Sequence, residues 1–165
     1  MKDQIANKML KKHLVDFSII IFIFLIDRIS KLLIISSPET YEQYGISVTS
    51  FLNFNLIWNE GIAFGLLSFN ESFFYNIITF FISIIIIILI YFAYKSKSFE
   101  KVSYVLIIGG ALGNLFDRIY YNAVPDFIDL HVNNFHWFIF NIADIFITLG
   151  ILCLIFDEIF FKKEV

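Results

Sequence analysis

The feature that most constrains the fold is residues 73–94, which hold no charged side chain and include the run IIIIILI at 84–90. As an α-helix this stretch would be about 33 Å long, enough to cross the ~30 Å hydrocarbon core of a bilayer. A helix that is apolar on every side needs a large protein core or lipid around it. A chain of 165 residues has too little interior for 22 Phe and such a helix. The stretch is therefore predicted to span a membrane.

Three further apolar stretches of similar length occupy residues ~14–35, ~102–120 and ~138–160. The composition agrees with a membrane protein, since 59% of the residues are hydrophobic, 19% are aromatic and the mean hydropathy is +0.79. We predict an all-α membrane protein in which residues 1–165 form a single domain, a bundle of four transmembrane helices.

Residues 36–72 and 121–137 are predicted to be loops on one side of the membrane. Within the first loop, residues 46–58 alternate between apolar and polar side chains, as in Leu52-Asn53-Phe54-Asn55. A period of two predicts one or two β-strands, so we expect a small sheet at the membrane surface.

The distribution of lysines and arginines predicts how the chain is oriented in the membrane. Of the 12 Lys and Arg residues, four lie in residues 1–13, three in 95–101 and two at the C-terminus, whereas the two long loops have none. The excess of basic residues on the cytoplasmic side then places both termini in the cytoplasm and both long loops outside. The first apolar stretch resembles a signal peptide, but it holds Asp27, Arg28 and Lys31 and no small-residue cleavage site follows it.

Several kinds of site are not indicated. The single cysteine, Cys153, excludes an intramolecular disulfide and is predicted to be a buried apolar filler. His131 and His136 lack the helical spacing of metal ligands and are predicted to be solvated loop residues. We expect no metal, no other cofactor and no nucleic-acid partner.

Polar residues gather instead at 109–144, within the most apolar half of the chain. They comprise Asn114, Asp117, Arg118, Asp126, Asp129, Asn141 and Asp144. Ionisable groups in such surroundings are costly and therefore indicate function. Counted from the predicted span ends at ~1.5 Å per residue, Asp27, the group at 114–118 and Asp144 all reach the outer half of the membrane.

Asp126 and Asp144 form the most informative pair. Two carboxylates in a low-dielectric setting tend to share one proton, so that one can act as a base for water and the other as an acid for the leaving group. Alternatively, each is separately hydrogen-bonded, Asp126 in a turn and Asp144 to its helix. Asp27, Asp117 and Asp129 are the rival members of such a dyad.

The neighbouring residues have simpler interpretations. Asp117 and Arg118 are interpreted as charges that compensate each other, although Arg118 could instead present its guanidinium to a substrate carbonyl or a lipid phosphate. Asn114 and Asn141 each lie one turn before an aspartate and could orient it or serve helix packing. The run GGALG at 109–113 is predicted to allow close helix contact.

Five segments of the chain carry a specific pattern. They are Asp27 with Ser30-Lys31, Asn59-x-Gly61-x-Ala63-Phe64, GGALGNLFDR (109–118), Val124-x-Asp126-Phe127 and FNIAD (140–144). In the order of these segments, and over nearly its whole length, the chain resembles the bacterial lipoprotein signal peptidases, also called signal peptidase II.

This resemblance implies a membrane aspartyl endopeptidase that removes signal peptides from prolipoproteins, cleaving before a cysteine that carries diacylglycerol. It implies that Asp126 and Asp144 are the catalytic residues. The substrate-binding or supporting residues that it implies are Asp27, Asn59, Gly61, Asn114, Asp117, Arg118 and Asn141. The expected partners are lipid-modified prolipoproteins and membrane lipids, the expected location is the bacterial inner membrane, and the protein is expected to be a monomer. The sheet would form a cradle on the outer face.

Two residues depart from the family pattern: Arg28 stands where Gln is usual, and Pro125 where a β-branched residue is usual. Proline fixes φ and removes a hydrogen-bond donor next to Asp126. Two other classes of function fit part of the sequence. In a small transporter or channel subunit the buried aspartates would relay protons or ions, and a purely structural subunit would leave them unexplained.

Overall fold

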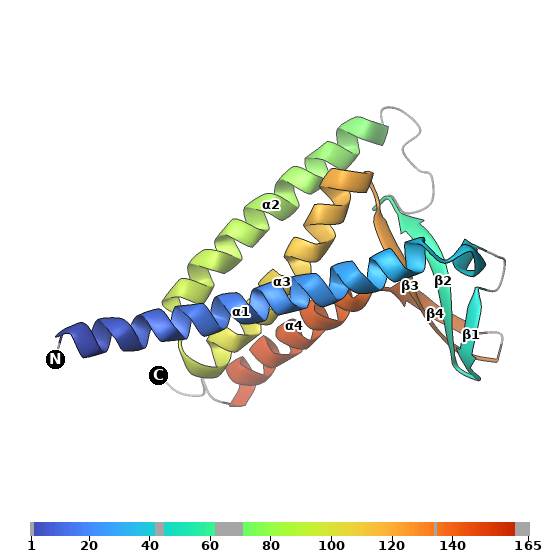
Figure 1. Cartoon of the computed structure of the whole chain (residues 1–165). Helices are drawn as coiled ribbons and strands as arrows, with labels where there is room; N and C mark the ends of the chain where they lie inside the picture. Colours follow the sequence, from blue (N-terminus) through green and yellow to red (C-terminus); the bar gives the residue numbers. More distant parts are fainter. Residues whose placement is uncertain (1, 42–44, 62–70, 134, 161–165) are drawn as a thin grey trace.

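The computed structural model describes residues 2–41, 45–61, 71–133 and 135–160, which form four helices and one four-stranded sheet (Figure 1). The helices are α1 (Lys2–Ile35), α2 (Glu71–Lys95), α3 (Ser98–Tyr121) and α4 (Ile142–Phe160). A short 3-10 helix, η1 (Pro38–Tyr41), follows α1. The strands are β1 (Ile46–Thr49), β2 (Leu52–Asn59), β3 (Val124–Val132) and β4 (Phe135–Phe140). The helix-rich fold with a small sheet is confirmed.

Helix α3 contacts all three other helices, and its glycines allow the closest of these contacts. A Cβ atom on Gly113 would lie 2.6 Å from Asp27 Oδ2 of α1, and one on Gly110 would overlap the Ala143 carbonyl oxygen of α4. Side chains at these positions would push α3 away from its neighbours. The predicted role of GGALG in close helix contact is confirmed.

The helices differ in how apolar they are. Within the part of the chain that the structure describes, two segments are long and apolar enough to cross a membrane, Tyr75–Lys95 and Ser98–Tyr121. Helix α1 carries Asp27, Arg28 and Lys31 in its apolar part, and the shorter α4 carries Asp144, Asp157 and Glu158. Much of the outer surface of α2 is apolar and exposed, as at Ile87, which is 67% exposed. Such a surface is typical of a helix that faces lipid.

The sheet is antiparallel in the order β1-β2-β3-β4 and lies at one end of the helices (Figure 1). The first two strands match the alternation at 46–58. The other two correct the prediction that 121–137 is a loop and that the last span begins at ~138. Strands β3 and β4 occupy 124–132 and 135–140, and α4 begins only at Ile142.

Pro125 is tolerated because of its place in the sheet. It pairs with Trp58 of β2, whereas the pairing of β3 with β4 runs from Ile128 and Phe140 to the hairpin end. At Pro125 the strand therefore has a paired neighbour on one side only, an edge position of the kind where proline is tolerated in a sheet.

The sheet packs on the end of α1 through a small apolar core. Ile34 of α1, Leu56 of β2 and Phe127 and Ile128 of β3 are all buried there. This core fixes β3 against the helices and thereby positions Asp126, the residue that precedes Phe127.

Two minor predictions are wrong. Cys153 is half-buried on α4 rather than fully buried. His131 and His136 face each other across the β3–β4 hairpin and are not loop residues. Their rings stack with centroids 5.0 Å apart.

Candidate active site

Asp126 lies on β3 and is only 5% exposed. Its Oδ2 accepts a hydrogen bond from Asn59 Nδ2 of β2 at 2.9 Å, and its Oδ1 accepts one from Asn141 Nδ2 at 2.6 Å. Burial raises the pKa of Asp126 to about 6, and the nearby carboxylate of Asp144 acts in the same direction, while the two amide hydrogen bonds oppose both effects.

Asp144 lies in the first turn of α4 and forms a reciprocal cap with Asn141. Asn141 Oδ1 accepts from the backbone N–H of Asp144 at 3.0 Å, and Asp144 Oδ2 accepts from the backbone N–H of Asn141 at 3.1 Å. This is the arrangement of a capping box, which satisfies two of the free N–H groups at a helix start. The positive end of the helix dipole favours a negative charge at Asp144.

Asn114 of α3 completes the surroundings of Asp144, since its Nδ2 donates to Asp144 Oδ1 at 2.8 Å. Each carboxylate thus accepts one hydrogen bond on each oxygen. Asn141 contacts both aspartates, so it fixes their relative position.

All three asparagines are oriented by groups that can only donate. The oxygen of Asn59 accepts from the N–H of Gly61 at 2.8 Å, that of Asn114 from Lys31 Nζ at 2.9 Å, and that of Asn141 from the Asp144 N–H. The NH₂ group of each amide must therefore point to the aspartates. The structure thus brings these three asparagines together around Asp126 and Asp144.

A buried charge cluster lies behind the aspartates. Lys31 is fully buried, and its three N–H donors reach Asp27 Oδ2 at 2.8 Å, Asp117 Oδ2 at 2.7 Å and Asn114 Oδ1. Asp117 also forms an ion pair with Arg28. The cluster therefore joins two carboxylates and two cations, which offsets the cost of burying each charge.

Asp27 connects this cluster to α4. Its Oδ1 accepts from the backbone N–H of Ala143 at 2.9 Å, the second residue of α4. The free N–H groups of the first turn of α4 are thus met by Asp27 as well as by the cap at Asn141. Asp27 therefore supports the position of Asp144 through the backbone of α4.

Asp117 and Arg118 do not compensate each other, which corrects the interpretation from the sequence. Consecutive residues of a helix point about 100° apart. Asp117 faces α1, whereas the Arg118 guanidinium lies 5.8 Å from the Tyr75 ring centroid of α2. Arg118 Nη1 is buried and has no hydrogen-bond partner among the described residues.

Gly61 lies against Arg118 and has a φ of +76°. A Cβ atom there would lie 3.0 Å from Arg118 Nη1. Glycine is therefore suited to this position on two grounds, the left-handed backbone and the approach of the guanidinium. Ala63 and Phe64, the remaining residues of this motif, lie outside the described residues.

Asp129 is separate from this group. Residues three apart on a strand face opposite sides, so Asp126 and Asp129 point away from each other. Asp129 Oδ2 instead contacts His136 Nδ1 of β4 at 2.8 Å. The structure brings Asp27 and Asp117 near Lys31, and only Asp126 and Asp144 share a common partner in Asn141.

Each of the two aspartates borders its own pocket. Asp126 lines a pocket of about 380 Å³ with Asn59, Glu60 and Trp58, among others. Asp144 lines an apolar pocket of about 210 Å³ between β4 and α4, with Phe138 and Phe140 on one side.

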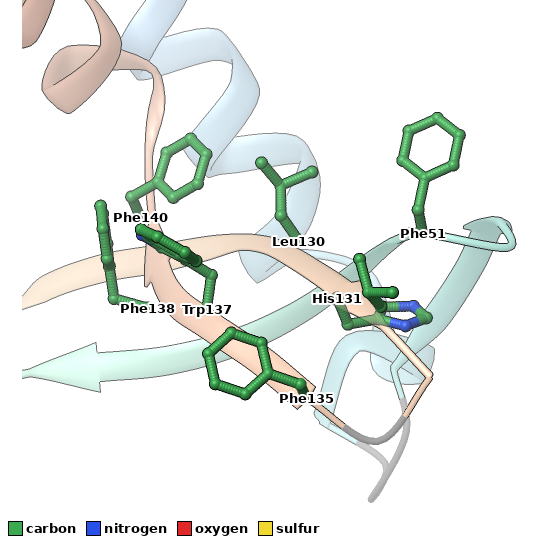
Figure 2. A pocket seen from close by; sticks show the side chains of 8 residues that line it. Phe51, Leu130, His131, Phe135, Trp137, Phe138 and Phe140 are labelled. Atoms are coloured by element: carbon green, nitrogen blue, oxygen red, sulfur yellow. The ribbon is translucent and has the colours of Figure 1, made fainter.

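The apolar pocket leads to a larger one on the sheet. Phe138 and Phe140 also line a pocket of about 530 Å³ together with Phe51, Leu130, Phe135 and Trp137, among others. Figure 2 shows these aromatic side chains gathered beside β3 and β4. Asp126 therefore borders a pocket of mixed polarity, and Asp144 borders an apolar pocket that shares Phe138 and Phe140 with the larger one on the sheet.

Lys31 and Arg28 belong to this site but were not predicted as site residues. The sequence does indicate Lys31, because it lies four residues after Asp27 in an apolar helix, and opposite charges pair at this spacing. Among the residues that the structure describes, no group of three or more His, Cys, Asp or Glu could hold a metal ion.

Comparison with solved structures defines the class of protein. Two structures, each described as "Bacterial membrane enzyme structure by the in meso method", match this chain with TM-scores of 0.71 and 0.73 at 32% and 33% identity. The first alignment covers 92% of this chain and 94% of the other, and the second covers 91% and 94%. The chain therefore shares the fold of these two bacterial membrane enzymes.

Sequence comparison defines the family. The profile of "Signal peptidase (SPase) II" matches residues 19–160, and the chain belongs to this peptidase family. A lipoprotein signal peptidase of Pelagibacter ubique is 50% identical over 155 residues, covering 94% of this chain and 93% of the relative. One of Francisella tularensis subsp. novicida is 40% identical over 162 residues, covering 94% and 98%. The resemblance inferred from the motifs is confirmed, and with it a role in lipoprotein signal-peptide removal.

Proposed function

We propose that this chain is an aspartic endopeptidase that cleaves prolipoproteins directly before their diacylglyceryl-modified cysteine. The observation that carries the proposal is the link through Asn141, which holds Asp126 and Asp144 together, each of them beside a pocket. Two carboxylates so arranged provide the acid and the base that peptide hydrolysis requires.

In this mechanism a water molecule between the carboxylates attacks the scissile carbonyl carbon. The ionised carboxylate takes a proton from the water, and the protonated one gives its proton to the departing nitrogen. We assign the ionised role to Asp144, at the positive end of α4, and the protonated role to Asp126, whose pKa of about 6 is raised by burial.

Arg118 has the role of holding the substrate. Its buried Nη1 lacks a partner among the described residues, and it lies beside Gly61 near the pocket that Asp126 borders. A guanidinium in this position can donate to a peptide carbonyl and orient the chain for attack.

The lipid on the substrate cysteine has an apolar surface to follow. The pocket beside Asp144 is lined by Phe138, Phe140, Ile145 and Leu149 and continues to the aromatic pocket on the sheet. Acyl chains that enter from the bilayer could lie along this surface while the signal peptide approaches Asp126 from the other side.

The proposed setting is the bacterial inner membrane. All four helices would span it, with both termini in the cytoplasm and the sheet on the outer face, as the distribution of lysines predicts. The whole chain would act as one domain, as a monomer in contact with membrane lipids, and without a metal or other cofactor.

The test is cleavage of a purified substrate. The protein in detergent should shorten a prolipoprotein that carries diacylglycerol on its cysteine and should leave the unmodified precursor intact. Mass analysis of the product should place the new N-terminus at the lipidated cysteine. Equal cleavage of both precursors would contradict the proposed specificity, and cleavage elsewhere would contradict the proposed site.

A further inference from the structure

A fourth pocket lies at the end of the molecule opposite the sheet, where the early part of α1 passes the junction of α2 and α3 (Figure 1). It has a volume of about 360 Å³. It is lined by Lys12, His13, Tyr94, Lys95, Ser96, Lys97 and Lys101. We call it the basic pocket, because the described residues that line it include four lysines and no Asp or Glu.

Contacts between helices hold the walls of the basic pocket together. His13 of α1 stacks on Tyr94 of α2, with centroids 6.2 Å apart and an interplanar angle of 13°. Lys101 of α3 is buried and forms an ion pair with Asp16 of α1. Asp16 thus offsets the charge of Lys101, while Lys12, Lys95 and Lys97 lie exposed around the opening.

The start of α3 adds to the positive potential. Its N-cap residue is Lys97, which has an extended backbone and makes no side-chain capping hydrogen bond. The first N–H groups of a helix carry partial positive charge and attract anions. The lysines and the helix start therefore favour the same ligand chemistry, a negatively charged oxyanion such as phosphate.

The surroundings favour the phosphate of a lipid over a free ion. Tyr91 and Tyr94 of α2 are 57% and 70% exposed beside the pocket, and tyrosines concentrate at the membrane–water interface. Further along α2, Ile87 and Ile90 present exposed apolar surface against which acyl chains can lie. Basic pockets between membrane helices are suited to anionic lipid headgroups.

We propose that the basic pocket binds the phosphate group of an anionic glycerophospholipid of the inner leaflet. This rests on the proposed orientation, in which this end of the molecule faces the cytoplasm, and it is independent of the peptide-cleaving site. The ammonium groups of Lys12, Lys95 and Lys97 contact the phosphate, and the acyl chains run along α2.

The experiment measures lipid retained by the full chain, with no reference to cleavage. The protein is reconstituted in nanodiscs of phosphatidylcholine with a minor fraction of phosphatidylglycerol, extracted gently and analysed by native mass spectrometry. We expect retained phosphatidylglycerol in excess of its share of the bilayer. Each exposed lysine should contribute roughly fivefold, so K12Q/K95Q/K97Q should weaken binding on the order of a hundredfold.

Matched variants separate a pocket from general charge. Lys11 is exposed on α1 next to Lys12 but does not line the pocket. K11Q should therefore retain the lipid while K12Q loses part of it, and the triple exchange to arginine should keep binding. Equal losses in K11Q and K12Q, or full retention in the triple glutamine variant, would overturn the proposal.

Inorganic phosphate distinguishes the two sources of the ligand. Millimolar inorganic phosphate should not displace phosphatidylglycerol from the wild type, since it lacks acyl chains. Displacement would assign the pocket to a free anion and contradict the lipid proposal. Loss of peptidase activity alone, with lipid retention intact, would count against the proposed function and leave this inference standing.

Discussion

Asn141 Nδ2 lies 2.6 Å from Asp126 Oδ1, and this contact ties the start of α4 to strand β3. The same residue caps α4 through Asp144, so one side chain sets the distance between two carboxylates on different elements. Cleavage and stability should both depend on this connection and on the charge cluster behind it.

Asn141→Ser and Asn141→Ala separate the two roles of this residue. Serine can still cap α4 but is too short to reach Asp126, whereas alanine does neither. Both variants should lose most of the cleavage activity, and alanine should lower the free energy of unfolding by about 1 kcal/mol more than serine, because only alanine also loses the cap. Cleavage rates and thermal unfolding in detergent measure the two effects. Full activity in the serine variant would show that the link to Asp126 is dispensable.

Asp126→Asn and Asp144→Asn should each reduce cleavage by roughly 10²–10⁴-fold or more, because the acid or the base is lost. Asp129→Asn is the matched control, since Asp129 is on the same strand but contacts His136. It should remain close to wild type. An essential Asp129 combined with a dispensable Asp126 would refute the assignment of the dyad.

Lys31→Met should destabilise the protein by on the order of 3–5 kcal/mol, because it leaves two buried carboxylates without their shared cation. Arg28→Gln should cost less, since Asp117 keeps Lys31 as a partner. Thermal unfolding followed by the fluorescence of Trp58 and Trp137 would measure both variants. Equal stability of the two would contradict the central place of Lys31 in the cluster.

Arg118→Lys keeps the charge but loses the planar guanidinium, so cleavage should fall well below that of the wild type. Gly61→Ala should have a similar effect, because its Cβ atom would press on Arg118 Nη1 and its φ of +76° would be strained. The comparison is made on the rate constant for cleavage and on the Michaelis constant. Unchanged values in both variants would reduce Arg118 to a general counter-charge.

The sequence revealed the parts of the fold and site that depend on local spacing. Apolar length predicted the helices, alternation predicted β1 and β2, and the two aspartates paired in the prediction, Asp126 and Asp144, share Asn141 as a partner. The strands at 124–140 were missed for identifiable reasons. Segment VPDFIDLH starts with a valine and a proline and does not alternate regularly, and FHWFIF is largely apolar, as at the start of a buried helix. The pairing of β3 depends on β2, which lies far away in the sequence, and β4 pairs with β3.

The ion pairs of the site could not be predicted from adjacent positions in the sequence. Asp117 and Arg118 are adjacent in the sequence, which favoured pairing them, but helix geometry points them to different neighbours. The actual partners of Asp117 are on α1, more than eighty residues earlier. Only the packing of α3 on α1 through Gly109 and Gly113 brings those groups together.

Stability should also respond to the titration of Asp126. Its pKa of about 6 in the folded protein lies above the ordinary value of 3.8, so the folded state holds the proton more tightly than the unfolded chain. This contribution to stability is fully present below about pH 4 and is lost as the pH rises through about 6. Asp126→Asn cannot titrate and should lack this part of the change in melting temperature. An identical pH dependence in wild type and variant would contradict the raised pKa.

The central claim, that two aspartates hydrolyse the peptide bond, is tested most directly by the rate of cleavage as a function of pH with EDTA present. A pair of carboxylates that shares one proton titrates as a unit and is active only in its singly protonated form. We predict a bell-shaped profile whose basic limb lies near the Asp126 pKa of about 6, with no effect of EDTA. Loss of activity in EDTA that a divalent metal restores would contradict the account and make the same carboxylates metal ligands.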